Sequence, residues 1–223
     1  MKKWLSLLLF LLMLAGVALP AEAAYELRLN VPEYKLRLFD GSRLLKEYSV
    51  AVGTPYEQTP VGQFSVFYKE KYPTWHPGSG FVDKTPVPPG PANPLGTRWM
   101  EFSRSYGIHG TNKDWSIEYP VSGGCVRMYN RDVEELFEKI SLGTPVLVTY
   151  ETMSLTEKAD GLYLTIFPDI YEKRSSTWRA FLALYQPYAG EYVLLRKPEF
   201  AAAQETVWSG KVAVRKQALR MGL

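Results

Sequence analysis

The amino-acid sequence predicts a mainly β protein with one main helix, followed by a small mixed α/β extension. Three observations lead to this fold class. Apolar residues alternate with polar ones over much of residues 25–68, which is typical of strands with one buried face. A single later segment, Asn130 to Gly143, has apolar residues at helical spacing. From Glu151 onward the pattern changes, and 223 residues suffice for one full domain with a smaller appendage.

The first predicted strands form a hairpin. Asp40-Gly41 is typical of a hairpin turn, and apolar and polar residues alternate both before and after this pair. The segment Thr59 to Gly62 fits a type I turn, with Pro60 at its second position. Alternation then restarts, so we expect the sheet to continue beyond this turn. The apolar positions that define these strands are Tyr34, Leu36, Leu38, Tyr48, Val50, Val52, Phe64, Val66 and Tyr68.

Residues 70–97 are rich in proline, glycine and aromatic residues, a composition that does not maintain a regular ladder. We therefore expect a long surface loop. Long ordered loops often carry function, and Trp75, with Trp99 just beyond the loop, is a candidate for a substrate-binding wall. The alternative is that these aromatic residues pin the loop to the core. His76 is expected to be structural or to line the groove.

The predicted helix has Asn130 as its N-cap and ends near Gly143. Acidic residues follow Asn130 in the first turns, where the helix dipole favours them. A further strand is expected over residues 145–150. The pattern after Glu151 indicates three short elements: a strand at 162–166, a helix at 175–185 and a strand at 212–214.

Residues 1–24 have the features of a secretory signal. Lys2 and Lys3 precede an apolar stretch from Trp4 to Leu19, and Ala21-Glu22-Ala23 supplies the small-residue cleavage pattern. This stretch is shorter than the roughly 20 residues that span a bilayer, which favours a cleaved signal over an uncleaved anchor. We therefore expect export to the periplasm or cell wall, with no membrane span in the mature chain. The predicted parts are a signal peptide (1–24), a catalytic domain (25–150) and an extension packed on it (151–223).

Charge and cysteine content narrow the function classes. The formal net charge is +3 with no run of basic residues, so nucleic acid is not an expected partner. Cys125 is the only cysteine and has no partner for an internal disulfide. A lone thiol in an exported protein is either a small buried hydrophobic group or a reactive one. One cysteine and two histidines give no recognisable ligand spacing, so we expect no metal and no other cofactor.

Two glycine-flanked segments, Ile108 to Thr111 and Ser122 to Met128, carry the residues with catalytic potential. The reactive form of a cysteine is its thiolate, and a thiol with a free pKa of about 8.5 needs a nearby imidazole or positive group to reach it. His109, 16 residues before Cys125, is the candidate base. The glycines allow a tight turn, so the backbone amides of Gly123, Gly124 and Cys125 are candidate donors to an oxyanion.

Arg127 is the candidate group for binding a substrate carboxylate. It follows Cys125 by two positions, and such residues project to the same side of an extended segment. Its planar guanidinium is suited to paired hydrogen bonds with a carboxylate. A surface charge, or an ion pair with Glu118 or Asp132, is the alternative.

Together these segments resemble the L,D-transpeptidase catalytic domain of the YkuD type. The resemblance extends over about residues 25–150 and implies a β-sandwich or barrel-like fold. It rests on six separated segments: Leu36-Arg37-Leu38-Phe39, Tyr48-Ser49-Val50-Ala51-Val52-Gly53, Thr59-Pro60-Val61-Gly62-Gln63-Phe64, Asn93-Pro94-Leu95-Gly96, Ile108-His109-Gly110-Thr111, and Ser122 to Met128.

The resemblance implies that Cys125 is the nucleophile and His109 its base, with the imidazole oriented by the carbonyl of Gly110. The other motif positions around the cysteine are occupied by Ser122, Gly124 and Arg127. Gly123 departs from the family, in which many members have histidine at this position. Because the implied base is the upstream histidine, we expect this difference to alter the groove more than the chemistry.

The implied reaction is the exchange of a peptide bond in peptidoglycan. Cys125 attacks the carbonyl between the third residue of a stem peptide and the following D-alanine, and a thioester forms. Transfer to an amine of another stem gives a 3-3 crosslink, whereas transfer to water is L,D-carboxypeptidase activity. The sequence does not decide between transpeptidase and carboxypeptidase activity. A third alternative is a non-catalytic wall-binding protein of the same fold. The resemblance also implies that carbapenem-type inhibitors acylate Cys125.

Overall fold

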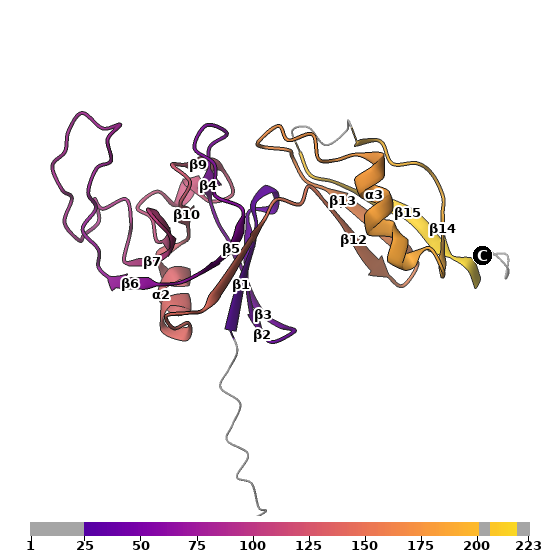
Figure 1. Cartoon of the computed structure of the whole chain (residues 1–223), viewed down its shortest axis with the longest axis horizontal. Coiled ribbons are helices and arrows are strands. Elements are labelled where there is room, and N and C mark those ends of the chain that lie inside the picture. Colours follow the sequence, from indigo (N-terminus) through magenta and orange to yellow (C-terminus); the bar gives the residue numbers. More distant parts are fainter. Residues whose placement is uncertain (1–24, 201–205, 218–223) are drawn as a thin grey trace, which may run out of the picture.

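The computed structural model describes residues 25–200 and 206–217 (Figure 1). The predicted signal peptide, residues 1–24, lies outside the described residues. The described chain is mainly β, as the sequence predicts. None of its helices combines the length and the apolar character that crossing a membrane requires.

A five-stranded sheet forms one layer of the N-terminal part. In their order across the sheet, the strands are β3 (Arg43–Ser49), β2 (Lys35–Asp40), β1 (Tyr25–Asn30), β11 (Pro145–Thr149) and β5 (Gly62–Ser65). Strand β11 is parallel to β1, and the other neighbours are antiparallel. The predicted hairpin is confirmed, since Gly41 lies between β2 and β3 with a φ of 57°, where glycine is favoured.

The predicted type I turn at Thr59 to Gly62 is wrong, because these residues form neither a turn nor a bend. Thr59 is buried and holds the chain in another path. Its hydroxyl accepts a hydrogen bond from the backbone amide of Gly53 at 2.9 Å, and its own amide donates to the hydroxyl of Tyr171 at 3.1 Å. Tertiary contacts therefore override the local turn preference of proline and glycine.

A second sheet carries the residues with catalytic potential. In order across it lie β10 (Val126–Arg127), β8 (Tyr106–His109), β7 (Arg98–Ser103) and β6 (Tyr68–Lys71). Strands β10 and β8 are parallel, and the other neighbours are antiparallel. A separate parallel pair, β4 (Val52–Gly53) with β9 (Pro120–Ser122), precedes Cys125. The short 3-10 helices of this part are η2 (Val31–Glu33) and η3 (Asp114–Ser116).

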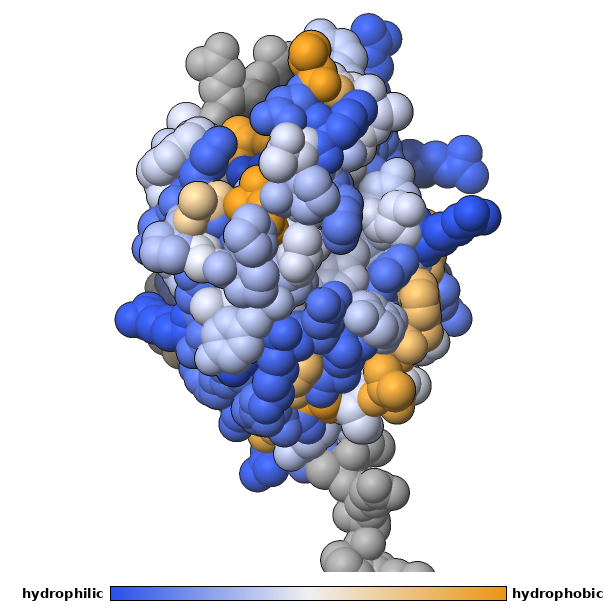
Figure 2. Space-filling model, turned by 90° about the vertical axis from the view of Figure 1, so that its left-hand side faces the viewer, coloured by the Kyte–Doolittle hydropathy of each residue, from blue (hydrophilic) through white to orange (hydrophobic). Residues whose placement is uncertain are grey.

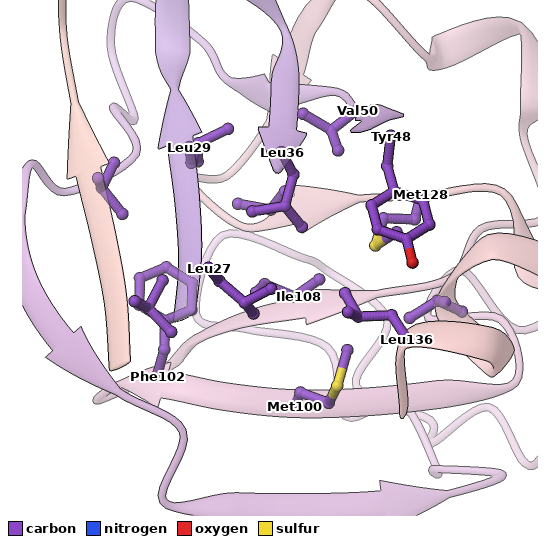
Figure 3. Close-up of a cluster of buried hydrophobic side chains, with 14 of the residues drawn as sticks. Leu27, Leu29, Leu36, Tyr48, Val50, Met100, Phe102, Ile108, Met128 and Leu136 are labelled. Carbon is purple, nitrogen blue, oxygen red and sulfur yellow. The ribbon is translucent and has the colours of Figure 1, made fainter. Parts of the chain in front are cut away.

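The two sheets and helix α2 (Asn130–Lys139) enclose one apolar core. Figure 3 shows side chains from both sheets and the helix meeting there, among them Leu27, Ile108 and Leu136. All three are at most 1% exposed. Because successive strand residues face opposite sides, burial of Ile108 turns its neighbours in β8 away from the core.

Helix α2 begins at Asn130, but the prediction that Asn130 is its N-cap is wrong. Tyr129 occupies that position, and the side chain of Asn130 makes tertiary hydrogen bonds instead. Its Nδ2 donates to the carbonyl of Thr111 at 2.9 Å, and its Oδ1 accepts from the amide of Thr97 at 3.2 Å. These bonds tie the helix to the segment that follows His109, and this competes with local capping.

The predicted loop is present between the end of β6 at Lys71 and the start of β7 at Arg98. Buried Asn93 holds it together, because its Nδ2 donates to the carbonyls of Pro73 at 2.8 Å and Val87 at 3.0 Å. Figure 2 views the side of the molecule on which this loop lies. That face is mostly hydrophilic, with small separate apolar patches.

The C-terminal region, residues 151–223, has its own sheet and its own core in the described part. Its elements are β12 (Met153–Lys158), β13 (Gly161–Ile166), α3 (Trp178–Tyr185), η4 (Gln186–Tyr188), β14 (Tyr192–Leu194) and β15 (Trp208–Arg215). The three elements predicted here are therefore confirmed in type and approximate position. In Figure 1 this region lies beside the N-terminal part. Tyr171, from the segment between β13 and α3, nevertheless belongs to the N-terminal core.

Candidate active site

The register between β8 and β10 brings the predicted site residues together. Ile108 pairs with Val126, and both face the core. His109 pairs with Arg127, which places these two side chains on the opposite face of the sheet. Cys125 lies two positions before Arg127 and projects to the same face. The sheet therefore gathers a thiol, an imidazole and a guanidinium on one surface.

His109 is held in a defined orientation. Its Nδ1 lies 2.6 Å from the carbonyl oxygen of Gly110. A carbonyl only accepts, so Nδ1 carries the hydrogen and Nε2 is left as the basic nitrogen. The indole of Trp99 stacks on the ring, with centroids 5.6 Å apart and planes at 28°. The carbonyl of Gly110 thus orients the imidazole, as the resemblance implies.

The imidazole of His109 is neutral at physiological pH. Burial lowers its pKa to about 4, and the positive charge of Arg127 acts in the same direction. Backbone hydrogen bonding by Gly110 and Leu95 opposes this shift, because it favours the protonated ring. A neutral ring that has carbonyl partners for its protonated form is suited to accept a proton during a reaction and release it later.

Cys125 is partly buried, and its thiol donates to the carbonyl of Ser105 across 3.7 Å. Burial raises its pKa, although a backbone hydrogen bond from Gly107 and the charge of Arg127 oppose the rise. The free protein therefore holds a neutral thiol. The sequence predicts a thiolate that forms with the help of a nearby imidazole or positive group, and the buried imidazole is uncharged. A neutral thiol can act as a nucleophile only if its proton is removed as the new bond forms.

Ser122 and the two glycines shape the turn before Cys125. The hydroxyl of Ser122 donates to the carbonyl of Cys125 at 2.6 Å and accepts from the amide of Gly124 at 3.1 Å. Gly124 has a φ of 100°, and a Cβ there would lie 2.4 Å from the ring of Tyr106, so the position requires glycine. With the Gly124 amide engaged, the amides of Gly123 and Cys125 remain as candidate oxyanion donors.

Arg127 is partly buried beside Cys125. The two carboxylates that the sequence offers as alternative partners are engaged elsewhere: Glu118 pairs with Lys35 at 2.9 Å, and Asp132 lies 3.5 Å from Arg131. Within residues 25–200 and 206–217, Arg127 forms no ion pair. Its guanidinium is therefore available to a substrate carboxylate.

The two predicted tryptophans lie in different surroundings. Trp99 is part of the site, since its indole covers Gly107 as well as His109. Trp75 makes its contacts within the long loop, through a β-bridge to Val87 and an edge-to-face contact with Phe81 at 5.0 Å. His76 is exposed. The described residues contain no cluster of side chains suited to a metal ion.

Three residues of the site were not predicted from the sequence. Ser105 binds the thiol through its backbone, and Tyr106 packs its ring against Gly124. Glu57 approaches Gly123, where a Cβ would lie 3.6 Å from its carboxylate. Tyr106 adjoins the predicted His109 segment, which was a usable signal. No pattern in the sequence shows that the loop around Glu57 folds over the glycines.

These features define a class, a β-rich protein with a cysteine, a buried histidine and an arginine gathered at two neighbouring strands of one sheet. The chain belongs to the L,D-transpeptidase catalytic domain (YkuD) family. The profile of this family matches residues 24–148, which is more than half of the chain. The family predicted from separated sequence motifs is thus confirmed.

Known proteins similar to this chain carry the same family name. The candidate L,D-transpeptidase YkuD of Bacillus licheniformis is 35% identical over 139 residues, covering 62% of this chain and 73% of that protein. The candidate L,D-transpeptidase YqjB of Bacillus subtilis is 43% identical over 119 residues, covering 50% of this chain and 64% of that protein. A solved L,D-transpeptidase from Mycobacterium smegmatis has a TM-score of 0.48 at 18% identity, covering 57% of this chain and 59% of that one.

Proposed function

We propose that the protein is a cell-wall L,D-transpeptidase that acts on peptidoglycan stem peptides through a thioester on Cys125. The observation that carries this proposal is the register between β8 and β10, which sets His109 and Arg127 on one sheet face, with Cys125 directly before β10. Membership of the L,D-transpeptidase family supports the reaction class. The residues to which the proposal assigns the chemistry are these three and the turn before Cys125.

The first half-reaction transfers the acyl group to sulfur. The thiol of Cys125 turns from Ser105 toward the carbonyl between the third stem residue and D-alanine, and its proton passes to Nε2 of His109. A carbon–sulfur bond forms, and the amides of Gly123 and Cys125 stabilise the resulting oxyanion. The carbon–nitrogen bond then breaks, and the imidazolium returns the proton to the departing amine of D-alanine. Arg127 holds a carboxylate of the substrate.

The second half-reaction consumes the thioester. An amine of another stem peptide attacks the acyl carbon while neutral His109 accepts a proton, and the sulfur leaves with that proton as the thiol. The product is a 3-3 crosslink. Attack by water through the same steps gives a tripeptide stem, which is the carboxypeptidase outcome. Access of amine or water to the thioester decides between them.

The setting of the reaction is part of the proposal. The predicted signal at residues 1–24 directs the chain out of the cytoplasm. The proposed substrate, peptidoglycan, lies outside the cytoplasm in the cell wall. Carbapenems present a strained β-lactam carbonyl to the same thiol, so we expect them to acylate Cys125. Peptidoglycan stems are the only partner that the proposal requires.

The products made from a defined substrate test this function. We would incubate the purified protein with a synthetic tetrapeptide stem ending in D-alanine and analyse the products by mass spectrometry. The proposal predicts release of D-alanine together with crosslinked dimers, and neither product in Cys125→Ala. Tripeptide without dimers would establish a carboxypeptidase instead. Binding to peptidoglycan without release of D-alanine would support the non-catalytic alternative.

A further inference from the structure

A loop of the N-terminal part, residues 53–59, lies against the turn that leads to the nucleophile. Its start is joined to that turn, because the amide of Thr54 donates to the carbonyl of Ser122 at 3.0 Å. A Cβ at Gly124 would lie 3.1 Å from the carbonyl oxygen of Gln58. This segment, called the 53–59 loop, therefore forms a wall beside Gly123 and Gly124.

The 53–59 loop is compact and directs one carboxylate at the site. The hydroxyl of Thr54 accepts from the amide of Glu57 at 3.0 Å, which fixes the turn within the loop. A Cβ at Gly123 would lie 3.6 Å and 3.7 Å from the two carboxylate oxygens of Glu57. The carboxylate thus lies in van der Waals range of the point where a side chain at Gly123 would begin.

The carboxylate of Glu57 is available to a ligand. It is solvent-exposed, and in the part of the chain that the structure describes it forms no ion pair. Arg127, whose charge acts on the thiol of Cys125, also has no carboxylate partner there. A carboxylate near Gly123 and a guanidinium near Cys125 suit a substrate that carries both an ammonium and a carboxylate.

Tyr171 of the C-terminal region clamps the base of the 53–59 loop. Its hydroxyl donates to the carbonyl of Gly53 at 3.0 Å and accepts from the amide of Thr59 at 3.1 Å, so one side chain joins the two ends of the loop. Tyr171 is 6% exposed. A buried hydroxyl with both its donor and acceptor functions used fixes the positions of its partners.

The segment that presents Tyr171 is itself braced. Its ring stacks on Tyr150, with centroids 5.1 Å apart. The hydroxyl of Tyr150 accepts from the amide of Tyr171 at 2.7 Å and donates to the carboxylate of Asp169 at 2.6 Å. Asp169 in turn accepts from the amide of Lys173 at 3.0 Å. The clamp is therefore held from both regions of the molecule.

We propose that Glu57 binds an ammonium group of the substrate and that Tyr171 is the positioning residue that holds the 53–59 loop in place for this contact. The proposal rests on the proposed function, since it presupposes that stem peptides react at Cys125. It gives the C-terminal region a defined part in substrate selection. The ligand chemistry is a primary amine on a peptide side chain, recognised by a carboxylate.

The test compares two peptides that differ in one charge. The first is the synthetic tetrapeptide stem with a free side-chain amine on its third residue, and the second has that amine acetylated. D-alanine release gives kcat and KM for each peptide. We expect the wild-type protein to prefer the free amine about fivefold in kcat/KM, as for a partly exposed ion pair. Glu57→Gln should remove this preference by raising KM for the free amine, with kcat retained.

The role of Tyr171 is tested by a double-variant cycle. Tyr171→Phe keeps the ring stacked on Tyr150 but loses the two hydrogen bonds to the loop. It should therefore reduce the preference for the free amine over the acetylated peptide, as Glu57→Gln does. In Glu57→Gln/Tyr171→Phe the preference should fall no further than in Glu57→Gln alone. The matched control is Tyr163→Phe, whose hydroxyl binds Asp160 within the C-terminal region, and it should leave the preference unchanged.

Two results would overturn the inference while leaving the proposed function intact. In the first, D-alanine is released, and the wild-type protein and Glu57→Gln show the same ratio of kcat/KM between the free-amine and the acetylated peptide. The other is equal loss of activity on both peptides in Tyr171→Phe, which would indicate a general structural role. Absence of D-alanine release from either peptide by the wild-type protein would instead contradict the proposed function.

Discussion

The N-terminal part and the C-terminal region are built from similar elements and contribute differently to the site. The N-terminal part packs two main sheets and helix α2 around its own core, and the C-terminal region combines one sheet and helix α3 with a second core. In the first, strand register places His109 and Arg127 on one sheet face, and Cys125 directly precedes the strand that carries Arg127. The second sends Tyr171 into the core of the first. The comparison teaches that register within one sheet brings the candidate site residues together, whereas the C-terminal region reaches the neighbourhood of the site through a single side chain.

The largest expected effect is on the chemistry of the N-terminal part. Cys125→Ala and His109→Ala should each lower kcat/KM for D-alanine release by about 10³-fold or more, because nucleophile and base act as a unit. The double variant should be no slower than the worse single variant. Losses that multiply in the double variant would show that the two residues act independently.

The next effect tests whether the two cores are separate. Phe181 is fully buried in the C-terminal core, so Phe181→Ala should cost about 3–5 kcal/mol of stability in that region. Thermal unfolding should then show an early transition assigned to the C-terminal region, while carbapenem acylation of Cys125 at lower temperature persists. A single cooperative transition, with acylation lost in parallel, would mean that the regions fold as one unit.

The third effect is a pH dependence that belongs to the N-terminal part. Burial lowers the pKa of His109 from 6.5 to about 4, so the unfolded chain takes up a proton between these values while the folded chain does not. The free energy of unfolding should fall as pH drops from 6.5 to 4, by up to about 3 kcal/mol, with no contribution above that window. Urea unfolding of His109→Gln should show a correspondingly flatter profile. An identical profile would contradict the buried, neutral state of His109.

The smallest effect concerns the turn before the nucleophile. Gly124→Ala forces a side chain into a backbone conformation with φ of 100° and against the ring of Tyr106. We expect a cost of about 1–3 kcal/mol in stability, together with reduced acylation of Cys125. Gly78→Ala is the matched control, because a Cβ there meets nothing within 4 Å. Equal effects of the two substitutions would show that the turn geometry is not required.

Much of the site was predictable because its residues adjoin each other in sequence or in register. Six separated motifs, including those around Cys125 and His109, identified the family, and alternation with the Asp40-Gly41 turn identified the first hairpin. Errors arose where distant groups compete with local preferences. Asn130 bonds two loops instead of capping its helix, and Thr59 meets Tyr171 instead of forming a turn.

Sequence patterns did not predict two further features of the molecule. The protonation states of Cys125 and His109 depend on how deeply the fold buries each group. The run of alternating residues from Phe64 to Tyr68 reads as one strand, yet it divides between β5 and β6 in different sheets. Both depend on long-range packing, which local periodicity does not encode.

The most direct test of the central claim is mass spectrometry of the protein after incubation with a carbapenem. Cys125 is the only cysteine, so an adduct on a cysteine side chain can form at one residue only. The account predicts one adduct per chain, located on the peptide that contains Cys125, absent from Cys125→Ser and formed more slowly in His109→Ala. An unmodified protein, or an adduct that persists in Cys125→Ser, would contradict it.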